Sequence, residues 1–297
     1  MRRFITASMT ALFVLVLAGC GGGGGGLKVQ ATADFLASAA QRTSDKQTGH
    51  MELTMSMAAA GRDVTFVADG AYDTANQRMQ MNFDLSSLLG QLGGASSDGG
   101  TLRSILGDSI EMRFVDDVMF MKMPFLSQLT GGKATDWVSF RAADAASNPL
   151  GPVGGADPAA LLDYLRGAGS EVSEIGQEDV RGVDTTHLST TITLRKAVES
   201  APEAQRARIQ ESIAKLGASG DQLLDTPIPV DVFVDSDGLV RRVRLVLSMP
   251  VEGQQVDADV QMDFFDFGTD VSVDAPPADQ VTDVTDKISA LSGAFAN

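Results

Sequence analysis

The sequence predicts an α+β protein built on one long, curved antiparallel β-sheet. Apolar and polar residues alternate through about ten or eleven segments, as in strands with one buried face. Helical spacing occurs in about three or four segments, and turn-forming residues separate the alternating segments. A sheet of this length with one apolar face must curl and cover that face, and the helices are the protein available to cover it.

The N-terminus has the features of a bacterial lipoprotein signal. Arg2 and Arg3 precede an apolar run that is too short to span a bilayer, and small residues then lead to Cys20. The string Leu-Ala-Gly-Cys at residues 17–20 resembles the bacterial lipobox, which implies removal of residues 1–19 and attachment of a diacylglycerol to Cys20. The alternative is an ordinary secretory signal that ends at a cysteine. We expect the chain to be lipid-anchored at the cell membrane, on its extracytoplasmic face.

This signal sets the expected domain organisation. Residues 1–19 are the expected signal peptide, and residues 20–29 are the lipidated cysteine with a glycine-rich tether. Residues 30–285 form one expected folded domain, and residues 286–297 are a C-terminal tail. No later apolar stretch approaches the roughly 20 residues that cross a bilayer, so we expect the acyl anchor alone to hold the protein at the membrane.

Charge and cysteine content exclude several functions. Without residues 1–19 the chain has 21 Lys and Arg (23 less Arg2 and Arg3) against 39 Asp and Glu, a net charge of −18. Such acidity argues against nucleic acid as a partner and against adhesion to anionic headgroups. Cys20 is the only cysteine, so no disulfide can form within the chain.

The first half of the domain predicts a helix followed by six strands. Residues 30–43 place Leu36 and Ala40 at helical spacing, and from His50 onward the period changes to two. Residues 85–100 are expected to interrupt the strands as a loop or short helix. Six consecutive strands with short connections indicate an antiparallel meander. The expected strands are residues 51–57, 64–72, 79–85, 110–114, 118–123 and 137–140.

The second half alternates helices with further strands. Asp157 and Pro158 are a favourable N-cap and first residue for a helix that reaches residue 167. Asp237-Gly238 is expected to form the turn of a hairpin. A Pro- and Asp-containing stretch follows from Asp274. The other expected elements are strands at residues 188–194, 230–234, 243–247 and 256–264, and a helix at residues 203–216.

The order of these elements resembles the LppX/LprAFG lipoproteins of mycobacteria and their relatives. The resemblance covers most of residues 27–285, and its local motifs are residues 228–243 (IPVDVFVDSDGLVRRV), Phe267-Gly268 and residues 275–277 (APP). It implies a strongly curved half-barrel similar to the carriers LolA and LolB, in which a few helices cover the concave face and leave an apolar cavity. It also implies binding of a lipid or acylated glycolipid. The sequence departs from the family at residues 85–101 and 148–158, so the size and mouth of a cavity stay open.

Methionine is concentrated in strand-like segments, which contain 11 of the 13 methionines when Met249, just after the strand expected at residues 243–247, is included. Its flexible, polarizable side chain adapts to acyl chains of different shape, although methionine also fills dry cores. Which pleat face is concave stays open, because a one-residue slip reverses every assignment. The residues expected to line the cavity are Met55, Phe66, Met81, Met112, Phe120, Leu188, Ile192, Val232 and Leu245.

Two short sequence segments resemble hydrolase motifs, but their predicted secondary structure differs from that of the hydrolases. Residues 107–110 (GDSI) resemble the nucleophile block of the GDSL esterases, and Asp184 and His187 have the spacing that those enzymes use. In that family the serine follows a buried parallel strand, whereas Ser109 opens an antiparallel hairpin and His187 lies within an alternating strand. We therefore expect no enzymatic activity.

A metal site or cofactor is not expected either. His50 is the only other histidine, so a histidine-rich site cannot assemble. Asp235 and Asp237 resemble part of a calcium loop that lacks its later carboxylate. The expected partners are a lipid or glycolipid, the membrane through Cys20, and a transporter or acceptor protein of unknown identity. The alternative is an envelope sensor or scaffold of the same fold, whose concave face is filled by its own side chains.

Overall fold

The structure, a computed structural model, describes most of the folded domain. The expected signal peptide, Cys20, the tether, the helix expected at residues 157–167 and residues 286–297 lie outside the described residues. So do most of residues 85–100 and 203–216. The described residues are 29–59, 62–86, 89–90, 103, 107–124, 136–141, 172–200, 206, 210, 224–251 and 254–285.

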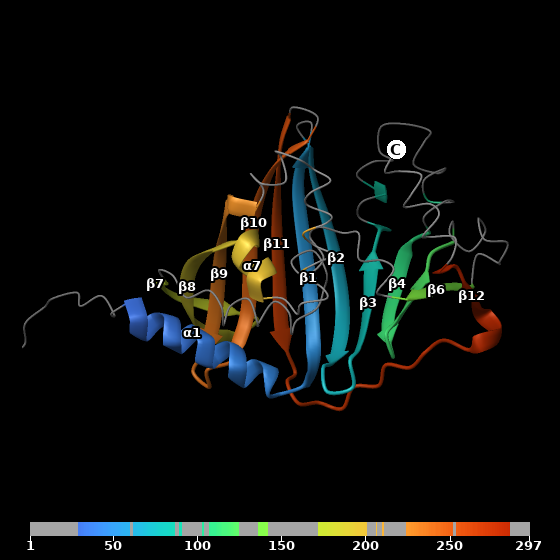
Figure 1. Ribbon diagram of the computed structural model, residues 1–297, viewed down its shortest axis with the longest axis horizontal. Helices are drawn as coiled ribbons and strands as arrows, with labels where there is room; N and C mark the ends of the chain where they lie inside the picture. The colour runs from blue at the N-terminus through green and yellow to red at the C-terminus, as the bar shows by residue number, and fades with distance from the viewer. Residues whose placement is uncertain are drawn as a thin grey trace, which may run out of the picture.

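Twelve strands form a single open sheet (Figure 1). The order across the sheet is β12-β6-β5-β4-β3-β2-β1-β11-β10-β9-β8-β7, and every neighbouring pair is antiparallel except β12 and β6. The predicted fold class is confirmed, with one parallel pair added at an edge. The strands are β1 (Thr48–Ala59), β2 (Arg62–Asp73), β3 (Arg78–Asp84), β4 (Ser109–Val115), β5 (Val118–Lys122), β6 (Trp137–Arg141), β7 (Ser173–Val180), β8 (Val183–Thr193), β9 (Pro227–Asp235), β10 (Val240–Val251), β11 (Gln254–Phe265) and β12 (Val281–Asp283).

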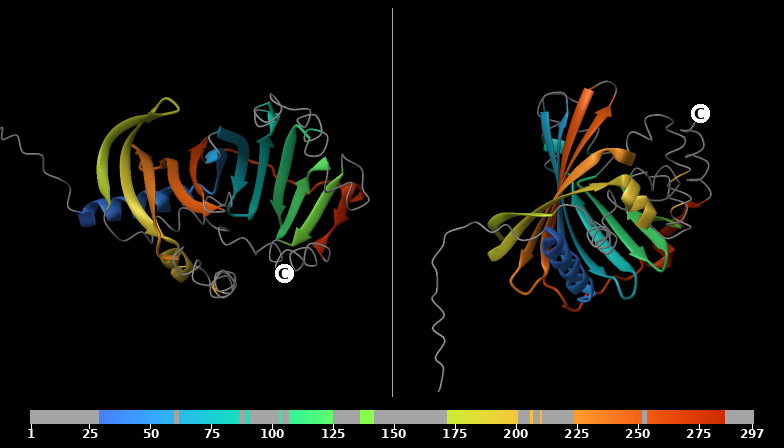
Figure 2. Two further views of the ribbon diagram at one scale, coloured as in Figure 1. Left: turned by 90° about the horizontal axis from the view of Figure 1, so that it is seen from above. Right: turned by 60° about the vertical axis from the view of Figure 1, so that its left-hand side comes forward.

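The sheet consists of two meanders that meet at β1 and β11. Strands β1 to β6 follow one another in chain order, which confirms the predicted first meander, and β7 to β11 form the second. The pairing of His50 with Phe265 and of Ala58 with Asp257 joins the two sets along almost the whole length of β1. The sheet twists strongly from one edge to the other (Figure 2).

Helix α1 (Val29–Ser44) packs on one face of the sheet, which we call the inner face. Leu36, Ala39 and Ala40 are buried there against side chains of the second meander. A helix of 16 residues is about 24 Å long, close to the roughly 19 Å that five neighbouring strands span. In Figure 1, α1 crosses the lower ends of β7 to β11 and leaves the first meander uncovered by this helix.

The C-terminal end of α1 is fixed to the start of β10 through Thr43. Its buried hydroxyl donates to the Ala39 carbonyl oxygen at 2.8 Å and accepts a hydrogen bond from the Val240 backbone N–H, also at 2.8 Å. One side chain therefore satisfies a helix carbonyl and a strand amide at the junction. This contact connects residues almost 200 positions apart in sequence.

The β9–β10 turn confirms the predicted hairpin and assigns a structural role to its first aspartate. Buried Asp235 accepts hydrogen bonds from the backbone N–H groups of Asp237 and Leu239, and its other oxygen accepts one from Arg241 Nε at 2.6 Å. Gly238 has a left-handed backbone (φ +75°), as the turn requires. The carboxylate thus holds the turn together.

Residues 266–285 form a segment that we call the C-terminal strap. It leaves β11, runs past the lower ends of β1 to β4 and ends in the 3₁₀-helix η2 (Ala278–Gln280) and β12 (Figure 1). Arg78 and Arg113 hold it by donating to the carbonyl oxygens of Val273 and Asp274. Val284 is buried against Val138 and Phe140. Residues 274–285 of the expected Pro- and Asp-containing stretch therefore pack against the sheet.

Three elements differ from the sequence-based expectation. Strand β7 was not predicted, because it is an edge strand whose side chains are mostly exposed and lack apolar alternation. Strand β12 was not predicted, because its three residues pair in parallel with a strand distant in sequence. Leu194 was expected to end a strand, but it begins the short helix α7 (Leu194–Ser200).

Candidate functional site

The structure brings eight of the nine predicted cavity residues onto the inner face. Pairing of Met55 with Phe66 and of Met81 with Met112 places these four on one face of the first meander. Leu188, Ile192, Val232 and Leu245 lie on the same face of the second meander, in the buried cluster that contains α1. That they contact a ligand stays a prediction.

Phe120 lies on the opposite, outer face. The β4–β5 hairpin pairs Val115 with Val118, so Met112 faces Met121 and Arg113 faces Phe120. Neighbouring paired residues project from the same side of a sheet, so Phe120 shares a side with charged Arg113. The sequence placed Phe120 with the other residues because residues 118–123 are almost entirely apolar, so their pattern does not indicate which side chains face inward.

The inner face has two regions that differ in burial. We call the part formed by β8 to β11 beneath α1 the covered region, where Val230, Val232, Val243 and Leu245 are at most 2% exposed. We call the part over β1 to β5 the methionine-rich region, where eleven apolar side chains remain partly exposed. They are Met55, Met57, Val64, Phe66, Met79, Phe83, Ile110, Met112, Phe114, Met119 and Met121.

The methionine-rich region is apolar in the side chains that the structure describes. Among the side chains that the structure describes on the inner face of β1 to β6, none is charged, and the Tyr72 hydroxyl is the polar group. Its six partly exposed methionines lie on β1, β3, β4 and β5. Such a surface can contact flexible hydrocarbon, and it offers no counter-charge to an ionic group.

Two glycines allow close packing at the border between the two regions. A Cβ on Gly70 would lie 2.6 Å from the Gln80 carbonyl oxygen, 3.1 Å from Met81 Cγ and 3.3 Å from Met51 Cε. A Cβ on Gly49 would lie 2.7 Å from the Tyr72 hydroxyl. The missing side chains therefore leave room for Met51, Met81 and the phenol ring.

Tyr72 links the border to the buried core. Its ring meets Phe264 edge to face at 6.4 Å between centroids. Burial raises the pKa of Tyr72 well above its ordinary value, because the phenolate would lose its hydration. The side chain therefore stays neutral at physiological pH.

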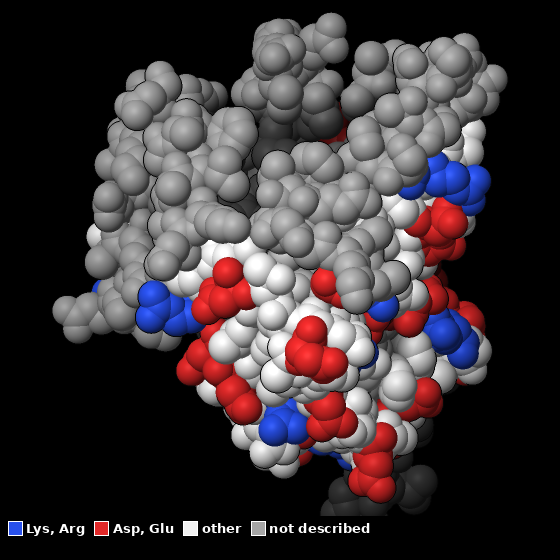
Figure 3. All heavy atoms as spheres, turned by 90° about the vertical axis from the view of Figure 1, so that its right-hand side faces the viewer, with Lys and Arg blue, Asp and Glu red and all other residues white. Residues whose placement is uncertain are grey.

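The outer face carries several ion pairs between neighbouring strands. Arg242 donates to both oxygens of Asp263 at 2.6 and 2.7 Å, and this hydrogen-bonded pairing raises the pKa of Arg242. Arg244 makes a more exposed pair with Asp259, which likewise raises the pKa of Arg244. On the side shown in Figure 3, acidic side chains are spread over the described surface without forming one patch.

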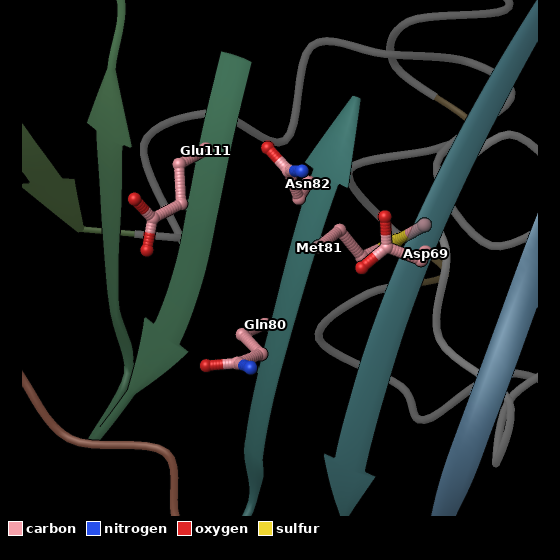
Figure 4. A pocket seen from close by; sticks show the side chains of 5 residues that line it. All are labelled: Asp69, Gln80, Met81, Asn82 and Glu111. Carbon is pink, nitrogen blue, oxygen red and sulfur yellow. The ribbon is translucent and has the colours of Figure 1, made fainter. Parts of the chain in front are cut away.

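A polar hollow of about 270 Å³ opens on the outer face of the first meander (Figure 4). Asp69, Gln80, Asn82 and Glu111 project around it from β2, β3 and β4, and Met81 completes its lining. Glu111 Oε1 is bound by Arg113. Carboxylate and amide groups of this kind can hydrogen-bond polar ligands, and the hollow is unsuited to hydrocarbon.

The residues of the hydrolase-like strings are not brought together. Ser109 is exposed on β4, and His187 lies seven strands away on β8, which is a separation of roughly 34 Å. His187 instead stacks on Phe233 at 4.4 Å, with Glu178 and Asp231 within 3.5 Å of its ring nitrogens. Its surroundings are a cross-strand cluster on the outer face.

No group of three or more His, Cys, Asp or Glu that could hold a metal ion occurs among the residues that the structure describes. Within the described helices, none combines the length and apolar character needed to span a membrane.

Comparison with known proteins gives one curated relative and several solved structures of similar fold. No protein-family model matches the chain. An uncharacterised 31.2 kDa protein of Streptomyces griseus is 28% identical over 204 residues, which cover 62% of this chain. This chain spans 60% of the length of that relative.

Two mycobacterial structures cover more of the chain at lower identity. LprF from Mycobacterium bovis matches with 13% identity and a TM-score of 0.44, covering 84% of this chain and 98% of LprF. The lipoprotein LppX from Mycobacterium tuberculosis also matches with 13% identity and a TM-score of 0.44, covering 80% of this chain and 98% of LppX.

Proposed function

We propose that this protein is a membrane-anchored lipoprotein that binds the acyl chains of a lipid or glycolipid on its methionine-rich region. One observation carries the proposal: eleven apolar side chains on the inner face of β1 to β5 remain partly exposed, whereas the covered region is buried beneath α1. A contiguous exposed apolar surface of this kind is characteristic of a binding site.

Hydrocarbon burial supplies the driving force for this binding. Each methylene removed from water contributes about 0.8 kcal/mol, so an acyl chain gains affinity along its whole length. Methionine side chains adjust to chains of different length and branching. The absence of charge on the described inner face of β1 to β6 favours the hydrocarbon part of a lipid, so the headgroup lies off this surface.

The anchor at Cys20 completes the proposal. A thioether-linked diacylglycerol with a further acyl group inserts enough methylenes to hold the protein stably at the membrane. The glycine-rich tether then keeps the folded domain next to the extracytoplasmic leaflet, where it can take up or release lipid. Handing the ligand to an acceptor across the cell envelope is the transport step of this proposal.

Two phenylalanines on the β4–β5 hairpin provide a matched test. Phe114 is partly exposed on the inner face, and Phe120 is partly exposed on the outer face of the neighbouring strand. The full chain is purified from its native membrane, and bound lipid is measured by native mass spectrometry for the wild type, Phe114→Glu and Phe120→Glu. We expect lipid on the wild type and on Phe120→Glu, and at least about tenfold less on Phe114→Glu, because a carboxylate opposes hydrocarbon.

The outcomes separate the carrier from the sensor or scaffold. A wild-type protein without co-purified lipid, or equal lipid on both variants, overturns the proposal and favours a non-carrier role. The covalent mass at residue 20 in the same spectra tests the anchor separately. If Cys20 carries no lipid, the proposed anchor is wrong. The amount of co-purified lipid then still tests the acyl-binding surface.

A further inference from the structure

A second hollow, of about 340 Å³, lies where the β7–β8 hairpin from one edge of the sheet reaches the end of β11 and the start of β10. The β7–β8 turn, the β11 end and the start of β10 form it. The β7–β8 hairpin bends toward the outer face at this edge (Figure 2, left). The lining residues are Val180, Arg181, Val183, Arg241, Phe264, Phe265 and Asp266.

Two guanidinium groups line this hollow, and each is held in place by an aromatic ring and a carboxylate. Arg181 lies over the Phe265 ring at 4.0 Å, and its Nη1 is 3.3 Å from Glu52 Oε1. Arg241 lies over the Phe267 ring at 4.8 Å, and its Nε donates to Asp235. Stacking and a single carboxylate contact fix the plane of each group before any ligand arrives.

Each arginine keeps donors that are free to bind a ligand. In the part of the chain that the structure describes, Arg181 Nε and Nη2 and Arg241 Nη1 and Nη2 make no hydrogen bond. The adjacent Phe264, Val180 and Val183 provide an apolar floor that excludes water from one side of the hollow. Planar guanidinium donors beside an apolar floor suit a phosphate or carboxylate group, which arginine binds through paired hydrogen bonds.

Backbone strain at Arg181 supports a functional role for its side chain. Arg181 and Gly182 form a two-residue turn with φ of +54° and +81°. Asn or Asp is favoured at the first position of such a turn, and the equivalent β4–β5 turn of this protein has Asp116 there. Arginine is unfavourable in this backbone conformation, and residues held in such conformations cluster at binding sites.

We propose that this hollow is an oxyanion-binding site in which Arg181 and Arg241 bind a phosphate group. Glu52 and Asp235 each neutralise part of one guanidinium, and Asp266 lies exposed at the rim. The site therefore binds a small anion reversibly and does not attract polyanions in general. The phosphate can belong to a phospholipid headgroup or be free in solution.

The substitution Arg181→Asn tests the site without threatening the fold, because Asn is preferred in this turn. The full chain is titrated with inorganic phosphate at constant ionic strength, and the amide shifts of Val180, Gly182 and Val183 are followed by NMR. We expect saturable shifts in the wild type and at least about tenfold weaker binding in Arg181→Asn, because one charge-assisted contact is lost. Arg244→Gln is the control, because it removes the same charge from a different part of the outer face.

A second titration, with dihexanoyl phosphatidylglycerol below its critical micelle concentration, distinguishes a phospholipid headgroup from free phosphate as the ligand. Tighter binding of this lipid than of inorganic phosphate, with the same loss in Arg181→Asn, identifies a headgroup, and equal binding identifies a free anion. The proposal is overturned if phosphate gives no saturable shifts, or if Arg181→Asn binds as the wild type does. Arg181 contacts Glu52 on the outer face, whereas Phe114 lies on the inner face of β4, so these results are independent of the acyl-binding test.

Discussion

The covered region and the methionine-rich region belong to one face of one sheet, yet they are buried to different degrees. Val232 and Leu245 beneath α1 are at most 2% exposed, and their partners are β-branched or compact residues. Phe66 and Met112 on the other meander are partly exposed, and their neighbours are mostly methionines. In the described part of the chain, the apolar face is therefore fully buried beneath α1 and only partly buried over β1 to β5.

The dimensions of the molecule explain where the border falls. Twelve strands span roughly 53 Å across the sheet, whereas α1 is about 24 Å long. Thr43 fixes the end of the helix at β10, and the helix extends from there toward the β7 edge. The first meander is therefore out of reach of this helix, whatever its side chains are.

The largest expected effect is a difference in core stability between the two regions. Leu36→Ala removes a 1% exposed side chain of α1 and should lower the free energy of unfolding by about 2–5 kcal/mol. Met112→Ala, on the partly exposed region, should lower it by less than about 1 kcal/mol in lipid-free protein. Urea unfolding of both variants measures the difference. Equal losses would show that the two regions are packed alike.

A smaller effect is expected where the two regions meet. Gly70→Ala introduces a Cβ that must displace the Gln80 backbone and the Met51 and Met81 side chains, and it should destabilise the protein by about 1–3 kcal/mol. Gly176→Ala is the control, because no heavy atom lies within 4 Å of the Cβ position there. Denaturant unfolding of the two variants should differ accordingly. A neutral Gly70→Ala would mean that the border is loosely packed.

Substitution of Tyr72 should change the stability of the protein least at neutral pH. Burial raises the pKa of Tyr72 in the folded state above its pKa in the unfolded chain. Below about pH 10 the phenol is neutral in both states, so it does not change the free energy of unfolding with pH. Above about pH 10 the unfolded chain loses this proton first, and the free energy of unfolding falls by up to about 1.4 kcal/mol per pH unit. Tyr72→Phe should remove this decline while changing the melting temperature little at pH 7. Thermal unfolding between pH 8 and pH 11 tests it, and identical alkaline profiles for both proteins would contradict burial of the phenol.

The sequence predicted most strands because alternation is a local signal. The first meander and the hairpin at Asp237-Gly238 follow from period-two patterning and turn residues alone. Strand β7 was not predicted, because the side chains of an exposed edge strand need not alternate between apolar and polar. The side of Phe120 was not predicted because its strand is apolar on both faces.

The candidate hollows required information that no local pattern contains. Arg181 and Arg241 are 60 positions apart in sequence, and the β7–β8 and β9–β10 connections bring them to one edge. The left-handed turn at Arg181-Gly182 is the one local signal that could have pointed to this place. The polar hollow around Asp69 and Glu111 likewise depends on the pairing of β2, β3 and β4.

The order of residues alone specifies an amphipathic sheet with an apolar, methionine-rich face, because side-chain alternation is set residue by residue. It also set the acidic charge and the candidate anchor at Cys20. The tertiary structure alone decided which half of that face is buried, because burial depends on where one helix is fixed and how far it reaches. Among the described residues, that placement leaves the apolar side chains of the methionine-rich region partly exposed.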